Sequence, residues 1–86
     1  MPIRDHIRQK PWPPDSPPGP AALTPREIEV AGYLGMDSTP AAIAQALGIQ
    51  RETVRIHMKN IYRKLGVRSR HAAVVTLLRA GHRVTP

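Results

Sequence analysis

The sequence predicts an all-α fold, with four helices in one domain preceded by an extended proline-rich arm. With 86 residues the chain is too short for two ordinary domains. Hydrophobic residues make up 41% of it but aromatic residues only 3%, and Phe is absent. The core must therefore be aliphatic, which suits small packed helices better than a sheet. From residue 23 onward, residues typical of helix starts and stops recur along the chain.

The predicted arm comprises residues 1–22, which hold seven of the ten prolines. Proline lacks a backbone donor and fixes φ, which disfavours both helix and sheet. We expect an extended polyproline II segment from Pro11 to Pro20. Its PxxP spacing could dock on an SH3-like groove, but this pattern is frequent in proline-rich tethers, and Trp12 could instead lie against the domain. Residues 23–86 are assigned to the domain.

The first helix is expected to begin at Pro25. Thr24 provides the capping hydroxyl, proline follows at the first helical position, and Glu27 completes a capping box. Gly35 marks the expected end of this helix. The expected apolar stripe consists of Ile28, Val30, Ala31 and Leu34.

A tight turn is expected between the second and third helices. Thr39 caps a short helix that begins at Pro40 and ends at Leu47. After the turn at residues 48–50, a longer helix runs from about 51 to 65 and ends at Gly66. A short helix, a tight turn and a longer helix form the helix-turn-helix arrangement, whose second helix lies in the major groove of DNA.

The third helix divides into two faces when its residues are placed 100° apart. One arc of about 100° is apolar and is expected to face the core; it holds Val54, Met58, Ile61, Tyr62 and Leu65. The opposite arc holds Glu52, Arg55, Ile56, Lys59 and Arg63, with Arg51 at its rim. We expect this outward face to be free for a ligand.

Positive charge is concentrated on the same stretch. The chain carries 13 Lys and Arg against 6 Asp and Glu, a net charge of +7. Residues 51–70 contain seven of the basic residues and one acidic residue, so +6 lies within this segment. A solvated helix face normally mixes the two signs. Double-stranded DNA is therefore the expected partner; structured RNA is compatible with the charge, but the stacking aromatics of most RNA-binding modules are lacking.

A fourth helix is expected from Arg70 to Ala80, with Ser69 as its cap and Gly81 as its stop. Its apolar residues span an arc of about 200°, roughly twice what one buried side requires. Either its own domain covers both sides, or the helix pairs with a second copy around a two-fold axis. We expect homodimerisation, with contacts from Val74, Val75 and Leu78.

Several blocks together resemble the LuxR/NarL/FixJ-type DNA-binding domain, also called the GerE type. They are residues 23–30, 43–44, 47–49, 53–57 and 60–67, followed by Arg70 and Ala73. The resemblance covers residues 23 to about 83 and implies four helices, of which the third contacts bases and the fourth commonly forms the dimer. The chain departs from the family pattern at Asp37, Pro40, Ala41, Ala42 and Gln50.

The resemblance also implies roles for individual residues. It places Arg55, Ile56 and Lys59 against bases and Thr53 against a phosphate. Together with the outward face, this gives the expected base contacts Arg51, Glu52, Arg55, Ile56 and Lys59. The expected phosphate contacts are Thr53, Arg63, Lys64 and Arg68.

Catalytic and metal chemistry have little support in this sequence. Cysteine is absent, and the four histidines do not fall at ligand spacing on one helix. We expect no enzyme activity, cofactor, metal or membrane segment, and a cytoplasmic location. The sequence predicts a stand-alone transcriptional regulator, with RNA polymerase or a larger LuxR-type regulator as further candidate partners. The alternative is an interaction protein that pairs with such a regulator and modulates it.

Overall fold

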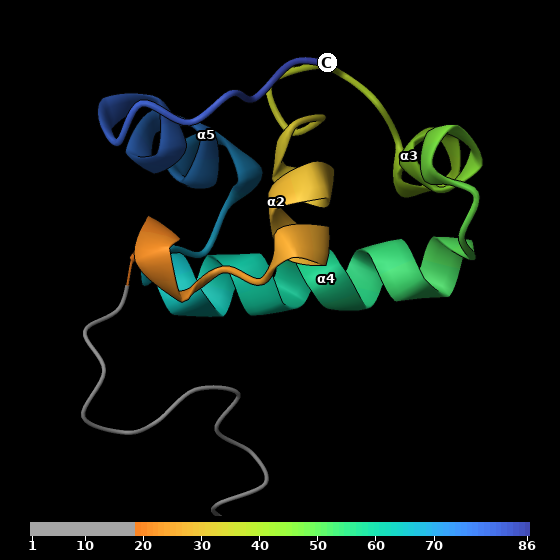
Figure 1. Ribbon diagram of the computed structural model, residues 1–86, viewed down its shortest axis with the longest axis horizontal. Helices are drawn as coiled ribbons and strands as arrows, with labels where there is room; N and C mark the ends of the chain where they lie inside the picture. The colour runs from red at the N-terminus through yellow and green to blue at the C-terminus, as the bar shows by residue number, and fades with distance from the viewer. Residues whose placement is uncertain (1–18) are drawn as a thin grey trace, which may run out of the picture.

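The computed structural model describes residues 19–86, which contain four α-helices, a short 3-10 helix and no strand (Figure 1). The elements are η1 (Pro20–Ala22), α2 (Pro25–Ala31), α3 (Pro40–Leu47), α4 (Arg51–Leu65) and α5 (Arg70–Arg79). The predicted all-α class with four helices is confirmed. The extended segment expected before residue 19, with its PxxP spacing and Trp12, lies outside the described residues.

The longest helix, α4, carries the other three along one side. Figure 1 shows α3 over the N-terminal end of α4, α2 over its middle and α5 over its C-terminal end. The last residues return from α5 to the turn that follows α2. This arrangement leaves the opposite side of α4 uncovered by the other helices.

Side-chain caps explain where three helices begin. The Thr24 backbone N–H donates to Glu27 Oε1 at 2.9 Å, and the Glu27 N–H donates to Thr24 Oγ1 at 3.2 Å, which completes the predicted capping box. Thr39 and Ser69 each accept a hydrogen bond at 3.1 Å from a backbone N–H three residues on. These interactions satisfy amide groups that have no partner within the helix.

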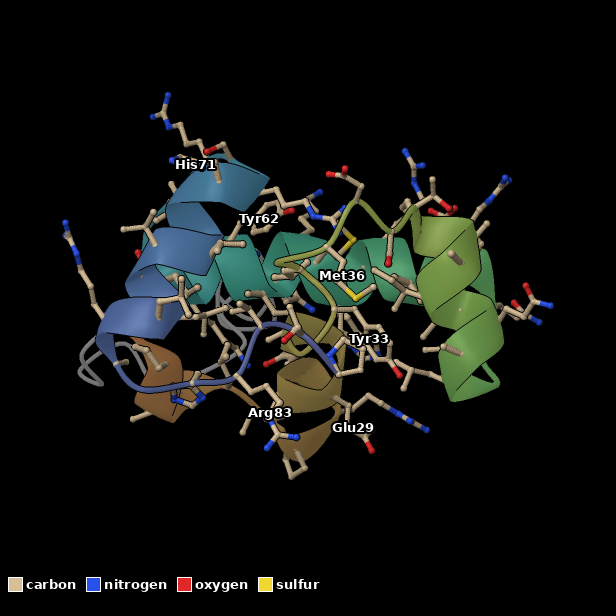
Figure 2. The ribbon with its side chains drawn as sticks, turned by 90° about the horizontal axis from the view of Figure 1, so that it is seen from above. Glu29, Tyr33, Met36, Tyr62, His71 and Arg83 are labelled. Atoms are coloured by element: carbon tan, nitrogen blue, oxygen red, sulfur yellow. The ribbon has the colours of Figure 1, made fainter. Side chains whose placement is uncertain are left out.

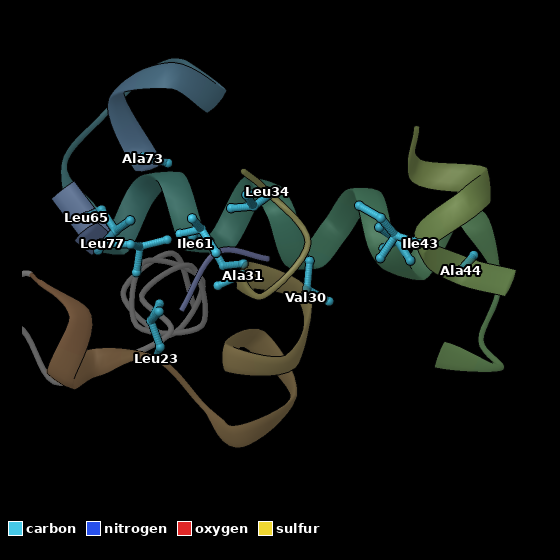
Figure 3. Close-up of a cluster of buried hydrophobic side chains, with 12 residues drawn as sticks. Leu23, Val30, Ala31, Leu34, Ile43, Ala44, Ile61, Leu65, Ala73 and Leu77 are labelled. Atoms are coloured by element: carbon cyan, nitrogen blue, oxygen red, sulfur yellow. The ribbon is translucent and has the colours of Figure 1, made fainter. Parts of the chain in front are cut away.

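The aliphatic core lies between α4 and the three helices packed against it (Figure 3). Val54 and Ile61 of α4 are fully buried, as are Ile43 of α3 and Leu77 of α5. The buried hydrophobic residues are Leu23, Val30, Ala31, Leu34, Ile43, Ala44, Val54, Ile61, Leu65, Ala73, Leu77 and Val84. The predicted inward face of α4 is therefore confirmed, with Met58 and Tyr62 half-buried at its edges.

The predicted inward stripe of the first helix is wrong at one position. Ile28 is 43% exposed, whereas Glu27 beside it is only 4% exposed. The capping box and a buried lysine both hold the Glu27 carboxylate inside the domain. Rotating this helix to bury Ile28 would break those polar contacts.

The first helix also ends earlier than predicted, at Ala31 rather than at Gly35. The chain continues through tight turns, in which Tyr33 N–H donates to Val30 O and Leu34 N–H to Ala31 O. Gly35 then meets the C-terminal segment, because its N–H donates to Val84 O at 2.7 Å. A Cβ atom at Gly35 would lie 2.6 Å from Val84 Cγ2, so the contact requires glycine.

Residues 19–22, which belong to the predicted arm, fold onto the domain. The Gly19 N–H donates to Lys64 O at the C-terminal end of α4, at 2.6 Å. Pro20 begins the 3-10 turn instead of ending an extended segment. This turn leads into Leu23, which is buried in the core.

Candidate nucleic-acid interface

The turn between α3 and α4 sets the direction of the long helix. Gly48 ends α3 in the left-handed conformation, with φ at 71°. Two residues later Gln50 occupies the N-cap position of α4, where its side chain makes no capping bond. Val54 anchors the first turn of α4 in the core. The short helix, turn and long helix thus form the predicted helix-turn-helix.

The outward side of α4 lines an open groove of about 760 Å³. Four of the expected base contacts lie along it, namely Glu52, Arg55, Ile56 and Lys59. Pro40 of α3 and the segment after α4 form its borders, and this segment contributes Val67 and Arg68. Ile56 is 53% exposed, so an apolar side chain faces outward among the charged side chains of the groove.

Two cations of this surface, Arg55 and Lys59, form no ion pair within residues 19–86. The two ion pairs of residues 19–86 are Arg26 with Glu29 and Lys64 with Glu27, and neither lies on the outward face. Arg63, which also lines the groove, donates to the Asn60 side chain on the same helix. The exposed Arg55 and Lys59 take part in neither ion pair and are therefore available to an anionic ligand.

Two expected contacts lie beside the groove and do not line it. Arg51, at the first position of α4, is exposed, and Thr53 is half-buried. Both are close in sequence to the groove residue Glu52. The structure thus brings six of the nine expected DNA contacts to one surface, namely Glu52, Arg55, Ile56, Lys59, Arg63 and Arg68.

Lys64 requires a correction, because it is not placed to contact a phosphate. Its side chain is 3% exposed, and its ammonium group lies 2.7 Å from Glu27 Oε1. Reaching a phosphate would leave the buried Glu27 carboxylate without its cation. Lys64 joins α4 to α2 and belongs to the packing of the domain.

Sequence reasoning placed Arg70 at the start of the fourth helix, in the family resemblance and among the positive charges, but missed its structural role. Its guanidinium donates to four backbone carbonyls of the segment between α2 and α3, those of Tyr33, Leu34, Met36 and Ser38. Figure 2 shows Tyr33 and Met36 on this segment. The first residue of α5 thereby holds the connection that leads into α3.

The expected dimer contacts differ in exposure. Leu78 is 55% exposed, whereas Val75 and Val74 are half-buried and Val74 packs against the core. Leu77 is fully buried and serves the domain itself. The apolar arc of α5 is therefore partly used within the domain, and Leu78 is its most exposed large side chain.

Tyr62 lies where α4 meets the start of α5 (Figure 2). Burial raises the pKa of its phenol above the usual 10.0, and the positive charge of Arg70 opposes this shift. The phenol is therefore neutral at physiological pH and adds no charge to the groove that it helps to line.

Residues 19–86 hold neither a metal-binding cluster nor a membrane-spanning helix. No cluster of three or more His, Asp or Glu side chains could hold a metal ion there. None of the helices in this part of the chain is long and apolar enough to cross a membrane.

A helix-turn-helix whose second helix exposes a basic face defines the class of DNA-binding regulatory proteins. The particular family follows from comparison with known proteins. The chain belongs to the luxR family of bacterial regulatory proteins, whose characteristic sequence pattern matches residues 21–77. It is thus a DNA-binding transcription regulator, of a family of regulators and not of enzymes.

Individual relatives agree with this assignment. The spore germination protein GerE of Bacillus subtilis is 51% identical over 59 residues, which cover 69% of this chain and 80% of GerE. The nitrate/nitrite response regulator protein NarP of Escherichia coli is 41% identical over 58 residues, but these cover only 27% of NarP. A solved structure of the transcription factor GerE matches with a TM-score of 0.64 and 42% identity, covering 69% of this chain and 88% of that one. The four-helix fold is therefore shared with GerE.

Proposed function

We propose that the chain binds double-stranded DNA sequence-specifically by placing the outward face of α4 in the major groove. The main observation behind this proposal is the exposure of the outward face. It lies on the side of α4 away from the core, it lines an open groove, and Arg55 and Lys59 on it are exposed and form no ion pair among residues 19–86. The helix-turn-helix arrangement presents such a face to base edges.

The exposed residues divide into two groups by their position. Arg55, Ile56 and Lys59 lie along the middle of the outward face and contact bases, together with Arg51 and Glu52 at its start. Arg63 and Arg68 lie beyond them at the border of the groove and contact phosphates, and Thr53 flanks the face and adds a third phosphate contact. Base contacts determine sequence preference, whereas phosphate contacts position the protein on the duplex.

The two groups are distinguished by substitution. Arg55→Ala or Lys59→Ala is expected to lower affinity for the preferred site by about 1 to 3 kcal/mol and to weaken base preference. Arg63→Ala or Arg68→Ala is expected to weaken binding to all sequences alike and to lower the salt slope by about one. Fluorescence anisotropy with selected and scrambled duplexes, over a range of salt concentrations, measures both effects.

A matched control is available on the C-terminal segment. Arg83 is exposed and lies on a different element, so Arg83→Ala removes the same charge without touching the groove. Its affinity and salt slope should remain close to those of the parent. If the four groove variants change affinity no more than Arg83→Ala does, α4 does not contact the DNA.

We propose further that the protein binds as a homodimer through the outer side of α5. Leu78 offers a large exposed apolar side chain, and Val75 extends the patch on the same helix. A two-fold dimer of helix-turn-helix domains contacts two half-sites, which supplies a use for this patch.

A further inference from the structure

The outward face of α4 contains one acidic residue, Glu52. It is exposed in the first turn of α4 and lines the same groove as Arg55, Ile56 and Lys59. A carboxylate on a surface that approaches DNA is repelled by the phosphates. Its place among the groove residues therefore needs a reason that offsets this repulsion.

Neutralisation by a neighbour does not provide that reason. Arg55 lies one turn further along, at a spacing that permits an ion pair. Yet the two ion pairs of residues 19–86 lie elsewhere, so the Glu52 carboxylate keeps its acceptor capacity for a ligand. A negative charge in the first turn does favour the helix dipole, but this role affects stability and has no bearing on base preference.

The edges of the bases in the major groove differ in what they offer to a carboxylate. Guanine presents only acceptors, and thymine presents an acceptor beside a methyl group. Adenine has an amino donor, but its N7 acceptor lies next to it and repels a negative charge. Cytosine alone presents a donor, its N4 amino group, without an acceptor of its own.

We propose that Glu52 is a specificity-determining residue that selects cytosine by accepting a hydrogen bond from the N4 amino group. This inference rests on the proposed placement of α4 in the major groove. The N-terminal residues of such a helix are the ones that contact base edges, and Glu52 is the second residue of α4. Any other base at this position would place an acceptor opposite the carboxylate. Cytosine is therefore favoured by a hydrogen bond, and the other bases are disfavoured by repulsion.

The test compares base preferences of the parent, Glu52→Ala and Glu52→Gln, each selected from random duplexes. The parent site is expected to contain one cytosine whose replacement by thymine lowers affinity roughly tenfold. Glu52→Ala should lose the preference at that position alone. Glu52→Gln keeps the size of the side chain but can bond to adenine N6 and N7, so its preference should move from cytosine to adenine.

Glu29→Gln is the matched control, since it removes one exposed carboxylate from α2, outside the groove. It should leave every base preference unchanged. The inference is overturned if Glu52→Ala and Glu52→Gln bind all sequences more tightly and alter no preference, because the carboxylate then acts only through its charge.

Failure of the proposed function would look different. If the parent itself shows no base preference, or if Arg55→Ala leaves every preference intact, α4 does not contact bases and both proposals fall. If Arg55→Ala changes the preferred site while the Glu52 variants do not, only the role of Glu52 is wrong. Circular dichroism of each variant confirms that the helices are intact.

Discussion

The Glu27 carboxylate illustrates how a single residue joins local and distant structure. Its Oε1 atom accepts from the Thr24 N–H at 2.9 Å and from the Lys64 ammonium at 2.7 Å. Both partners of the ion pair are almost fully buried. A buried charge is costly without its counter-charge, so each member of this pair depends on the other.

Replacing Lys64 by alanine should therefore lower the free energy of unfolding by about 3 to 5 kcal/mol, because Glu27 would stay buried without a cation. Urea unfolding followed by circular dichroism measures this change. Arg63→Ala, on the exposed neighbour, should shift stability by no more than about 0.5 kcal/mol. Equal effects at the two positions would contradict the assignment of Lys64 to the domain's packing.

The same pair shows what sequence patterns miss at this scale. Rotation around α4 identifies the buried Val54 and Ile61, because they lie at the centre of an apolar arc. Lys64 has a cationic side chain like Arg63, and its partner lies 37 residues away. Rotation places Arg63 on the outward arc and leaves Lys64 outside it, but it gives no sign of the distant carboxylate that Lys64 meets. The exposure of Ile28 follows from the same long-range contact.

At the scale of elements, Arg70 fixes the connection between α2 and α3. Backbone carbonyls of a turn need donors, and here one guanidinium serves four of them. This connection ends at Thr39, the cap of α3. The start of α5 thus holds the segment that places α3 over α4.

Arg70→Ala should lower the free energy of unfolding by about 2 kcal/mol or more, since several charge-assisted hydrogen bonds are lost together. Amide hydrogen exchange should increase between residues 33 and 38 before it increases in α4. Arg70→Lys should not restore protection, because an ammonium group cannot reach four carbonyls in the fork geometry of arginine. Full protection in Arg70→Lys would show that positive charge alone is sufficient.

Helix starts were predictable because capping is local. Thr24, Thr39 and Ser69 each bond to an amide three residues on, and the sequence displays this spacing directly. The end of α2 was not predictable in the same way. The tight turns that follow α2 bring Gly35 against Val84. A contact between the middle and the end of the chain has no sequence signature.

On the scale of the whole molecule, α4 supports the core on one side and presents on the other the exposed groove that we propose faces DNA. Helix-turn-helix topology and the charge of residues 51–70 were sufficient to predict this surface. The proposed dimer rests instead on the outer side of α5, where burial within one chain already accounts for part of the apolar arc.

Leu78→Glu tests the proposed dimer. Leu78 is 55% exposed, so the variant should fold, remain monomeric at micromolar concentration and lose most of its affinity for a duplex with two half-sites. Binding to a single half-site should persist. Size-exclusion mass, with and without duplex, provides the measurement.

Leu77→Ala is the control for this experiment, because Leu77 is buried within one chain. It should lower stability by about 2 to 5 kcal/mol and leave the mass of the folded protein unchanged. If Leu78→Glu binds the two-half-site duplex as well as the parent does, α5 is not the dimer contact. A parent that stays monomeric on DNA would instead favour pairing with a larger regulator or with RNA polymerase.

The two-sided character of α4 has an evolutionary consequence. Val54 and Ile61, which the fold requires, point inward, whereas Glu52, Arg55 and Ile56 line the outer groove and contribute nothing to the core. Substitutions at the outer positions are therefore nearly neutral for folding. Under the proposed placement of α4 in the major groove, a duplicated copy of this domain can change its target sequence step by step while remaining folded throughout.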